Sequence, residues 1–344
     1  MNKKLLAAAV AAAVVAAPAA FADAVVYGKF HTSIDQIDNS TNVDNWQVNG
    51  RASRLGFKGS EDLGNGLKAI YQLELGFNSD GGGTGQTGAS SGLGGGSRNT
   101  FVGLSGGWGT FIVGRHDTPM KMAFYAAGNE VLGDSAIDLN MSNSLTPSKS
   151  DKSPIGVFSE YRANDAIAYV SPSFGGFSFA AAVIPGEDTT AAAPNERDGI
   201  ADHYSLGAMY KGGGLKASLG YQETDGGTVD QETMQVGASY TFGMFQIGGQ
   251  YEKTDNFAFV TNDDYDAWAI VGKAKFGNSA VSLVYTDSEL DNNYESQGWG
   301  LAADHSLSKR TKVYAAYATD ERDPAGGGAS TDVDVFSLGV IHDF

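Results

Sequence analysis

Cysteine is absent from the 344 residues of this chain, and proline occurs only 8 times. Without cysteine, the protein has no disulfide bond, no thiol nucleophile and no thiolate metal site. Basic residues are also in the minority, because 23 Lys and Arg against 40 Asp and Glu leave a formal net charge of -17 at pH 7. Proteins that bind nucleic acid carry a basic footprint, so this composition argues against a nucleic-acid partner.

The N-terminus has the parts of a secretory signal peptide. Two lysines precede the apolar stretch 5–15, and the triplet Ala20-Phe21-Ala22 has the small-x-small pattern that signal peptidase recognises. We therefore expect residues 1–22 to be cleaved, leaving residues 23–344 with a net charge of -19, because two lysines and no acid are lost. An uncleaved membrane anchor is the alternative, but the apolar stretch is short for one.

Long hydrophobic runs are missing from the rest of the chain. No later segment approaches the roughly 18–20 consecutive apolar residues of a membrane helix. The chain instead contains 15 Tyr, 18 Phe and 47 Gly, a composition typical of strands and turns.

The apolar residues alternate with polar ones. In segment 67–77, large apolar side chains fall on one face and Lys68, Gln72 and Glu74 on the other. The alternation returns at 265–275, where Tyr265, Ala267, Ala269 and Val271 share a face, and at 312–319. A period of two indicates strands and excludes helices. A barrel in lipid produces this pattern, because every second side chain faces its lumen.

Sixteen strands are predicted from this alternation and from the turns between the segments. They cover residues 24–35, 46–60, 67–78, 98–105, 110–116, 161–171, 177–185, 203–211, 215–224, 232–241, 245–255, 265–275, 279–288, 296–306, 312–321 and 331–344. Tight Gly-containing turns and long polar loops alternate, as in outer-membrane barrels. We predict an all-β fold, a 16-stranded antiparallel transmembrane β-barrel wide enough for an aqueous lumen. A soluble β-sandwich is the alternative, but it rarely needs so many strands.

One connection breaks the size pattern. Residues 117–160 show no convincing alternation, yet they include Met120, Phe124, Tyr125 and Met141, which need a wall to pack against. A long irregular segment in a compact protein is usually functional or disordered. We expect this segment to be a constriction loop that folds into the barrel and narrows its pore. A mobile extracellular loop is the alternative.

Several motifs resemble those of the Gram-negative general diffusion porins, over essentially the whole mature chain. They are the segment Ser53-Arg54-Leu55-Gly56-Phe57-Lys58-Gly59 with the residues 61–67 that follow, Tyr27-Gly28-Lys29, Phe101-Val102-Gly103-Leu104, Gly114-Arg115 and the terminal Phe344. The resemblance implies a homotrimer in the cell outer membrane, in contact with lipid and lipopolysaccharide. It also implies passive diffusion of ions and small hydrophilic solutes.

In that family, basic side chains on the barrel wall face acids on the constriction loop, and the field between them filters solutes. Carried over by position, the basic wall consists of Lys29, Arg54, Arg98 and Arg162. Strand parity agrees, since each lies opposite the large apolar residues of its strand. Arg115 shares a face with Phe111 and Val113 and is expected at a subunit contact. Arg51 also has the wrong parity, unless a bulge redirects it.

The loop acids lack the Pro-Glu-Phe-Gly-Gly segment of the enteric members. Glu130, Asp134 and Asp138 are the only acids between Asp117 and Asp151, and we nominate them as the acidic side of the filter. Four basic wall residues against three acids predict a weak preference for anions, because local charges in a narrow passage outweigh distant, screened ones. For each arginine, a structural salt bridge without a selective role is the alternative.

Catalysis has little support in the sequence. None of the five histidines has a spacing that a nucleophile and base would need, and a Gly-x-Ser-x-Gly elbow is absent. We therefore expect no enzyme activity, cofactor or metal site. Two other functions stay open: a substrate-specific channel, which predicts saturable block by one solute, and a surface adhesin or receptor, which predicts a closed or very narrow lumen.

Overall fold

The computed structural model describes residues 24–40, 43–80, 95–141, 150–186 and 198–344. The expected signal peptide, residues 1–22, lies outside these ranges and stays a prediction. Within them, no helix has the length and apolar character needed to cross a membrane. The described helical elements are short: the α-helix α2 (Pro119–Ala126) and the 3-10 turn η1 (Phe257–Phe259).

Seventeen strand segments form one antiparallel sheet. They are β1 (Val25–Asn39), β2 (Val43–Gly50), β3 (Arg54–Gly64), β4 (Leu67–Gly76), β5 (Gly95–Gly106), β6 (Gly109–Asp117), β7 (Arg162–Val170), β8 (Phe177–Ile184), β9 (His203–Gly212), β10 (Leu215–Thr224), β11 (Gln231–Phe242), β12 (Phe245–Asp255), β13 (Tyr265–Phe276), β14 (Ser279–Leu290), β15 (Tyr294–Ser306), β16 (Thr311–Pro324) and β17 (Thr331–Asp343). β1 pairs with β2 through residues 32–39 and with β3 through residues 25–29, so β2 and β3 are two parts of one barrel strand. The predicted sixteen-stranded barrel is thus confirmed.

The second barrel strand, predicted as 46–60 without a break, is interrupted at residues 51–53. Ala52 lies in the left-handed region, with a φ of 42°. The chain stays attached to β1 at this point, because the backbone N–H of Arg51 donates to the carbonyl of His31 at 2.8 Å. The irregular backbone turns the Arg51 side chain inward, where only 2% of its surface is exposed.

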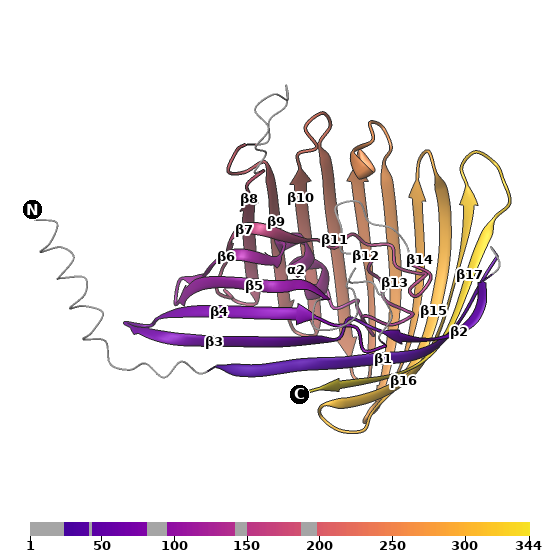
Figure 1. Ribbon diagram of the computed structural model, residues 1–344, viewed down its shortest axis with the longest axis horizontal. Helices are drawn as coiled ribbons and strands as arrows, with labels where there is room; N and C mark the ends of the chain where they lie inside the picture. The colour runs from indigo at the N-terminus through magenta and orange to yellow at the C-terminus, as the bar shows by residue number, and fades with distance from the viewer. Residues whose placement is uncertain (1–23, 41–42, 81–94, 142–149, 187–197) are drawn as a thin grey trace, which may run out of the picture.

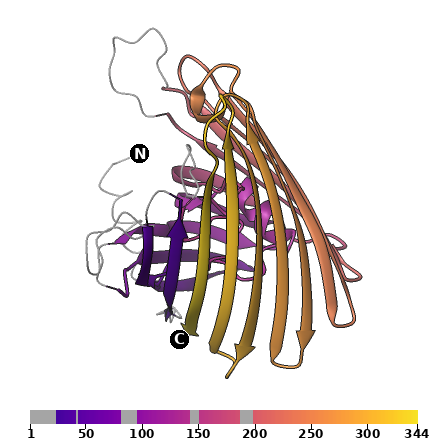
Figure 2. The ribbon, with the colours of Figure 1, turned by 90° about the vertical axis from the view of Figure 1, so that its right-hand side faces the viewer.

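The barrel closes between its first and last strands. Figures 1 and 2 show β17 beside β1, which completes the curved wall, and β1 pairs with β17 along eleven residues. At the end of the chain, Phe344 N–H donates to the Gly28 carbonyl at 3.1 Å, and Gly28 N–H donates to the Phe344 carbonyl at 3.2 Å. Closure matters because an unpaired strand edge in hydrocarbon would leave each free backbone group at a cost of several kcal/mol.

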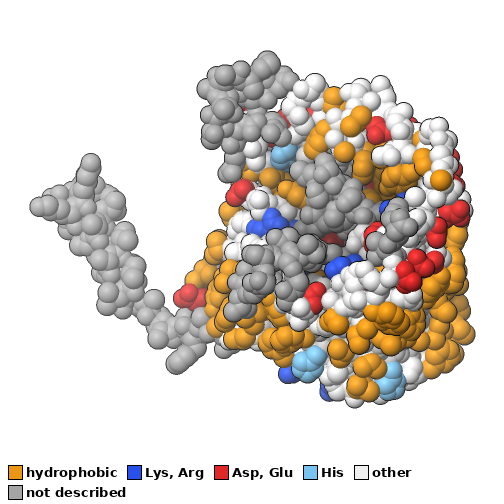
Figure 3. Space-filling model, turned by 45° about the vertical axis from the view of Figure 1, so that its right-hand side comes forward, with side chains coloured by type: hydrophobic (Ala, Val, Ile, Leu, Met, Phe, Trp, Pro, Cys, Tyr) orange, Lys and Arg blue, Asp and Glu red, His pale blue; other side chains and the backbone are white. Residues whose placement is uncertain are grey.

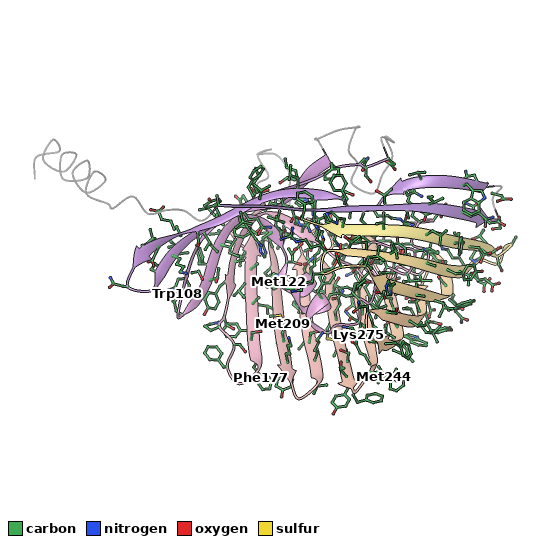
Figure 4. The ribbon with its side chains drawn as sticks, turned by 90° about the horizontal axis from the view of Figure 1, so that it is seen from below. Trp108, Met122, Phe177, Met209, Met244 and Lys275 are labelled. Atoms are coloured by element: carbon green, nitrogen blue, oxygen red, sulfur yellow. The ribbon has the colours of Figure 1, made fainter. Side chains whose placement is uncertain are left out.

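The outer wall is apolar. Phe30, Ile34, Val102 and Leu283 are all about half exposed on it, and apolar side chains cover much of the flank that Figure 3 shows. Aromatic side chains gather near the tight turns, including Trp108 and Phe177, which Figure 4 labels. Trp108 stacks on Tyr169, and the rings of Phe177 and Tyr210 lie 4.5 Å apart. Such a girdle marks one boundary of the hydrocarbon layer.

The connection between β6 and β7 lies inside the barrel. Its described residues, 118–141 and 150–161, are called the inner loop below. Phe124, Ile137, Leu139 and Ile155 are essentially unexposed in it, and they pack with the inner wall into one apolar cluster.

The inner loop covers an apolar inner face of β13. Tyr265, Ala267, Ala269 and Val271 are buried in the cluster beneath the loop, whereas Trp268 and Ile270 are exposed on the outside. The alternation that the sequence displays at 265–275 therefore marks the inner wall of this strand and not its lipid-facing side.

Candidate functional site

The inner loop enters the barrel through α2. Thr118 caps the helix by accepting a hydrogen bond from Lys121 N–H at 3.3 Å, and Pro119 stands in the first turn, where no N–H is needed. The N–H of Met120 donates to the Ser205 hydroxyl of β9 at 3.0 Å. Space for the helix comes from small wall residues, because a Cβ on Gly220 would lie 2.8 Å from Met120 Cγ.

The segment after α2 is tied to the wall by side chains that bind its backbone. Ser239 donates to the Ala127 carbonyl at 2.6 Å, and Gln246 donates to the Gly128 carbonyl at 2.6 Å. Polar wall residues therefore satisfy backbone groups that would otherwise be buried without partners.

The returning half of the loop is held by Glu252 of β12, which is fully buried. Its carboxylate accepts the Ser159 N–H at 2.8 Å and the Ser159 hydroxyl at 2.6 Å. Gln235 donates to the Ser159 carbonyl at 2.9 Å, and Tyr265 donates to the Val157 carbonyl at 2.5 Å. The loop is thus fixed to the wall on both sides of its tip, which is the part around Asp134.

A polar hollow of about 480 Å³ remains between the inner loop and the wall. All four basic residues predicted for the wall, Lys29, Arg54, Arg98 and Arg162, line it. Lys29 and Arg54 are direct neighbours, because β1 and β3 pair at these positions. The residues that the sequence nominated on four different strands are therefore brought together in space.

Most of these cations have carboxylate partners. Arg98 forms an ion pair with Glu74 of β4. Arg162 contacts Asp117 at 2.8 Å and donates to the Asn99 side-chain oxygen at 2.7 Å. Arg54 forms no ion pair with any residue that the structure describes.

Of the three nominated loop acids, Asp134 alone lines the hollow. Its carboxylate lies 3.7 Å from Lys29 Nζ. Burial raises the pKa of Asp134, but the positive charges of Lys29 and Arg54 outweigh that effect and hold the pKa below its usual range. Asp134 therefore presents a negative charge to the basic wall at neutral pH.

Glu130 and Asp138 face the interior of the loop. Glu130 accepts the Leu139 N–H at 3.1 Å, and Asp138 accepts the Asp134 N–H at 2.6 Å and the Asn140 N–H at 2.9 Å. Burial and the charge of Asp138 raise the pKa of Glu130 well above its usual range. Burial, together with Asp134 and Glu160, raises the pKa of Asp138 to about 7. These two acids order the loop from within, and neither of them lines the hollow.

Sequence reasoning missed part of the hollow. Lys121 of α2 lies 3.1 Å from both Asp117 and Glu160, and Tyr125 donates to Glu160 at 2.6 Å. All four line the hollow. The predicted antiparallel strands 110–116 and 161–171 already place residues 117 and 160 near each other. Nothing in the irregular segment, however, indicated that Lys121 and Tyr125 point toward these two acids.

Arg51 and Arg115 do not line the hollow. Arg51 contacts Asp35 at 2.7 Å and donates to the Lys152 carbonyl at 2.7 Å, so it joins the inner loop to β1. Arg115 donates to the Ser97 carbonyl at 2.7 Å and to the Asn164 side chain. Neither arginine therefore belongs to the set of side chains around the hollow.

Comparison with known proteins identifies the class of this barrel. A family model described as Gram-negative porin matches residues 7–325, and the chain belongs to that family. The chain is 28% identical to an outer membrane porin protein of Bordetella pertussis, over 100% of this chain and 91% of the relative. The protein is accordingly an outer-membrane channel for passive diffusion of solutes.

Two solved structures share the fold. The anion-selective porin from Comamonas acidovorans superimposes with a TM-score of 0.74 and 24% identity, covering 94% of this chain and 100% of that one. OmpT of Vibrio cholerae, in its trimer form, gives a TM-score of 0.64 and 16% identity, covering 94% and 99%. At these identities the two structures show the shared fold, whereas the family match associates the chain with channel proteins.

Proposed function

We propose that the inner loop is the constriction of the pore and that the hollow beside it filters ions with a weak preference for anions. The observation that carries this proposal is the excess of positive charge in the hollow, which eight basic and four acidic side chains line. In a narrow passage with low-dielectric walls, such an excess favours ions of the opposite sign.

The distribution of ion pairs supports the same direction of selectivity. Asp117 and Glu160 each lie 3.1 Å from Lys121, and Asp134 is 3.7 Å from Lys29. Their negative charges are thus largely neutralised by partners, whereas the Arg54 guanidinium has no carboxylate partner among the described residues. The anion-selective function named for the Comamonas acidovorans structure is consistent with this reasoning.

The test is the reversal potential in a planar bilayer under a KCl gradient. We expect the wild-type protein to give a potential of the sign for anion preference. Arg54→Ala combined with Arg98→Ala should shift it toward cations, because the change removes two positive charges and leaves Glu74 without its ion-pair partner. Lys253→Ala is a control for the loss of a positive charge elsewhere, since this lysine pairs with Asp255 and is 42% exposed, away from the hollow.

An unchanged potential in the double variant would remove these arginines from the filter. A wild-type protein that conducts without anion preference would refute the proposed selectivity itself. Saturable block by one uncharged solute would favour a substrate-specific channel. Tyr125 is a suitable stacking residue for such a solute, because it is 45% exposed and lines the hollow.

We also propose that three copies of this barrel associate in the outer membrane, in contact with lipid and lipopolysaccharide. The trimer form of OmpT, which shares the fold, supports this assembly. The mass of the detergent-solubilised protein, measured by native mass spectrometry, checks it. A monomeric mass in a detergent that preserves conductance would contradict it.

A further inference from the structure

The hollow beside the inner loop extends to the turn between β15 and β16. Lys309, Arg310 and Lys312, in and just after this turn, line the same space as Lys29 and Arg54. Two groups of cations therefore face one cavity of about 480 Å³, one at the loop tip and the other at the turn end of the barrel.

Three of these cations have no carboxylate partner among the described residues. Lys312 lies 2.9 Å from Asp304, and Arg98, Arg162 and Lys121 have the partners described above. Arg54, Lys309 and Arg310 form no ion pair within the described part of the chain. Arg54 thus lies at the loop-tip end of the hollow, and Lys309 and Arg310 lie at its turn end.

The turn that carries Lys309 and Arg310 is ordered by its own hydrogen bonds. The Ser308 hydroxyl accepts the N–H groups of Arg310 at 3.1 Å and Thr311 at 3.0 Å. The Arg310 carbonyl accepts the Asp343 N–H at 2.8 Å, which ties the turn to the end of β17. A preorganised turn loses little conformational entropy when its side chains engage a ligand.

We propose that this hollow binds multivalent oxyanions, which bridge the guanidinium of Arg54 and the basic turn at Lys309 and Arg310. Guanidinium and ammonium groups bind phosphate and carboxylate oxygens through charge-assisted hydrogen bonds. A monovalent anion neutralises one such group at a time, whereas an anion with several charged groups engages both ends. This inference rests on the proposed anion selectivity and adds the class of solute that the pore retains.

The ligand enters from the turn end. Lys211 and Lys275 add exposed positive charge at that end, where Figure 4 labels Lys275. The opposite end carries exposed acids such as Asp291, Glu295 and Asp323, in or beside the connections after β14 and β16. Opposite charge at the two mouths steers a polyanion toward one of them.

Single channels in 0.1 M KCl provide the test, with sodium tripolyphosphate added to one side at a time. We expect saturable block from the turn side at concentrations where added chloride has no effect, and weaker block from the other side. In Lys309→Ala with Arg310→Ala, the half-blocking concentration should rise about fivefold, the size expected for two partly exposed charge pairs. Citrate in a parallel series distinguishes a condensed phosphate from a polycarboxylate, and block by either one supports the site.

Lys211→Ala with Lys275→Ala is the matched control, because it removes the same charge from the same end at residues that do not line the hollow. If both double variants lost block equally, the block would depend on the overall positive charge of the turn end and not on a site in the hollow. This result would overturn the proposal. Absence of block in the wild type, or unchanged block in the turn variant, would also overturn it. The anion selectivity itself is measured separately, from the wild-type reversal potential without polyanion.

Discussion

Replacing Glu252 with alanine should release the returning half of the inner loop. The Glu252 carboxylate accepts two hydrogen bonds from Ser159, at 2.8 and 2.6 Å, in a site without solvent exposure. A hydrogen bond to a charged group contributes about 1.5–3 kcal/mol. Losing both therefore weakens the attachment by at least about 3 kcal/mol, which raises the population of detached loop roughly 100-fold.

The consequence is an increase in current fluctuations, because a detached segment moves into and out of the lumen. Single-channel recordings should show new conductance levels in Glu252→Ala, and limited proteolysis should cut the loop faster. Glu252→Gln is the control, since its amide oxygen still accepts the Ser159 N–H. Assembly of the barrel is checked for each variant by its heat-dependent migration in gel electrophoresis.

A folded Glu252→Ala protein with the noise and proteolysis rate of the wild type would refute the reasoning. Should Glu252→Ala fail to assemble, Ser159→Ala gives a milder version of the same test. This change removes only the 2.6 Å bond from the hydroxyl and keeps the backbone bond. It should produce a smaller increase in noise, and none at all would count against the anchor.

Three further predictions concern charge and packing. Asp134→Asn should increase the anion-to-cation permeability ratio about two- to fivefold at 0.1 M KCl, since a charge at about 4 Å contributes roughly 1 kcal/mol in water before screening; a reversal potential that shifts toward cations would contradict this. Because the pKa of Asp138 is about 7, this acid is neutral below that pH and charged above it, so anion preference should rise as the pH falls from 8 to 6. Asp138→Asn should remove most of that dependence, and an unchanged pH profile would exclude Asp138 as its source. Gly300→Val should destabilise the assembled protein by about 1–3 kcal/mol in thermal unfolding, because a Cβ there would lie 2.5 Å from Ile137 Cγ2, and Ile137→Ala in the same chain should restore much of the loss.

The barrel could be predicted from the sequence because its determinants are local. A period of two is visible within each strand, and tight turns such as 242–245 and 276–279 appear directly between strands. An even number of strands makes the first and last strands antiparallel, which lets them pair and close the barrel. The strand ends differ by a few residues, as at β5, which begins at Gly95 and not at residue 98.

The break at residues 51–53 and the inward apolar face of β13 could not be predicted in this way. The break depends on Ala52, which adopts the left-handed conformation. An alanine at this position gives no sign of that conformation in the sequence. The inner loop covers the apolar inner face of β13, and Ala267 and Val271 are buried in the cluster beneath that loop. Alternation indicates that two faces differ but does not identify the one that meets lipid.

In the candidate site too, the residues on strands could be predicted and those on irregular backbone could not. The family resemblance nominated four basic residues that lie on strands, and strand parity agreed that each faces the lumen. The structure brings these residues, Lys29, Arg54, Arg98 and Arg162, to one cavity. The loop acids lie on irregular backbone, where neither parity nor spacing gives a direction. Nothing in the sequence distinguished Asp134, which faces Lys29, from Asp138, which accepts backbone N–H groups inside the loop.

The position of the loop links these features to selectivity. Asp134 stands at the tip with a φ of 61°, and its distance to Lys29 is set by anchors far from it, at Ser159 and Ala127. A Coulomb interaction of this kind changes steeply when a few ångströms are added, because solvent and salt then enter between the charges. Wall residues without any charge, such as Gly220 and Gly300, therefore contribute to the filter by allowing the loop to approach. A change in selectivity caused by a glycine substitution in the wall, with every charged residue intact, would be the direct consequence of this arrangement.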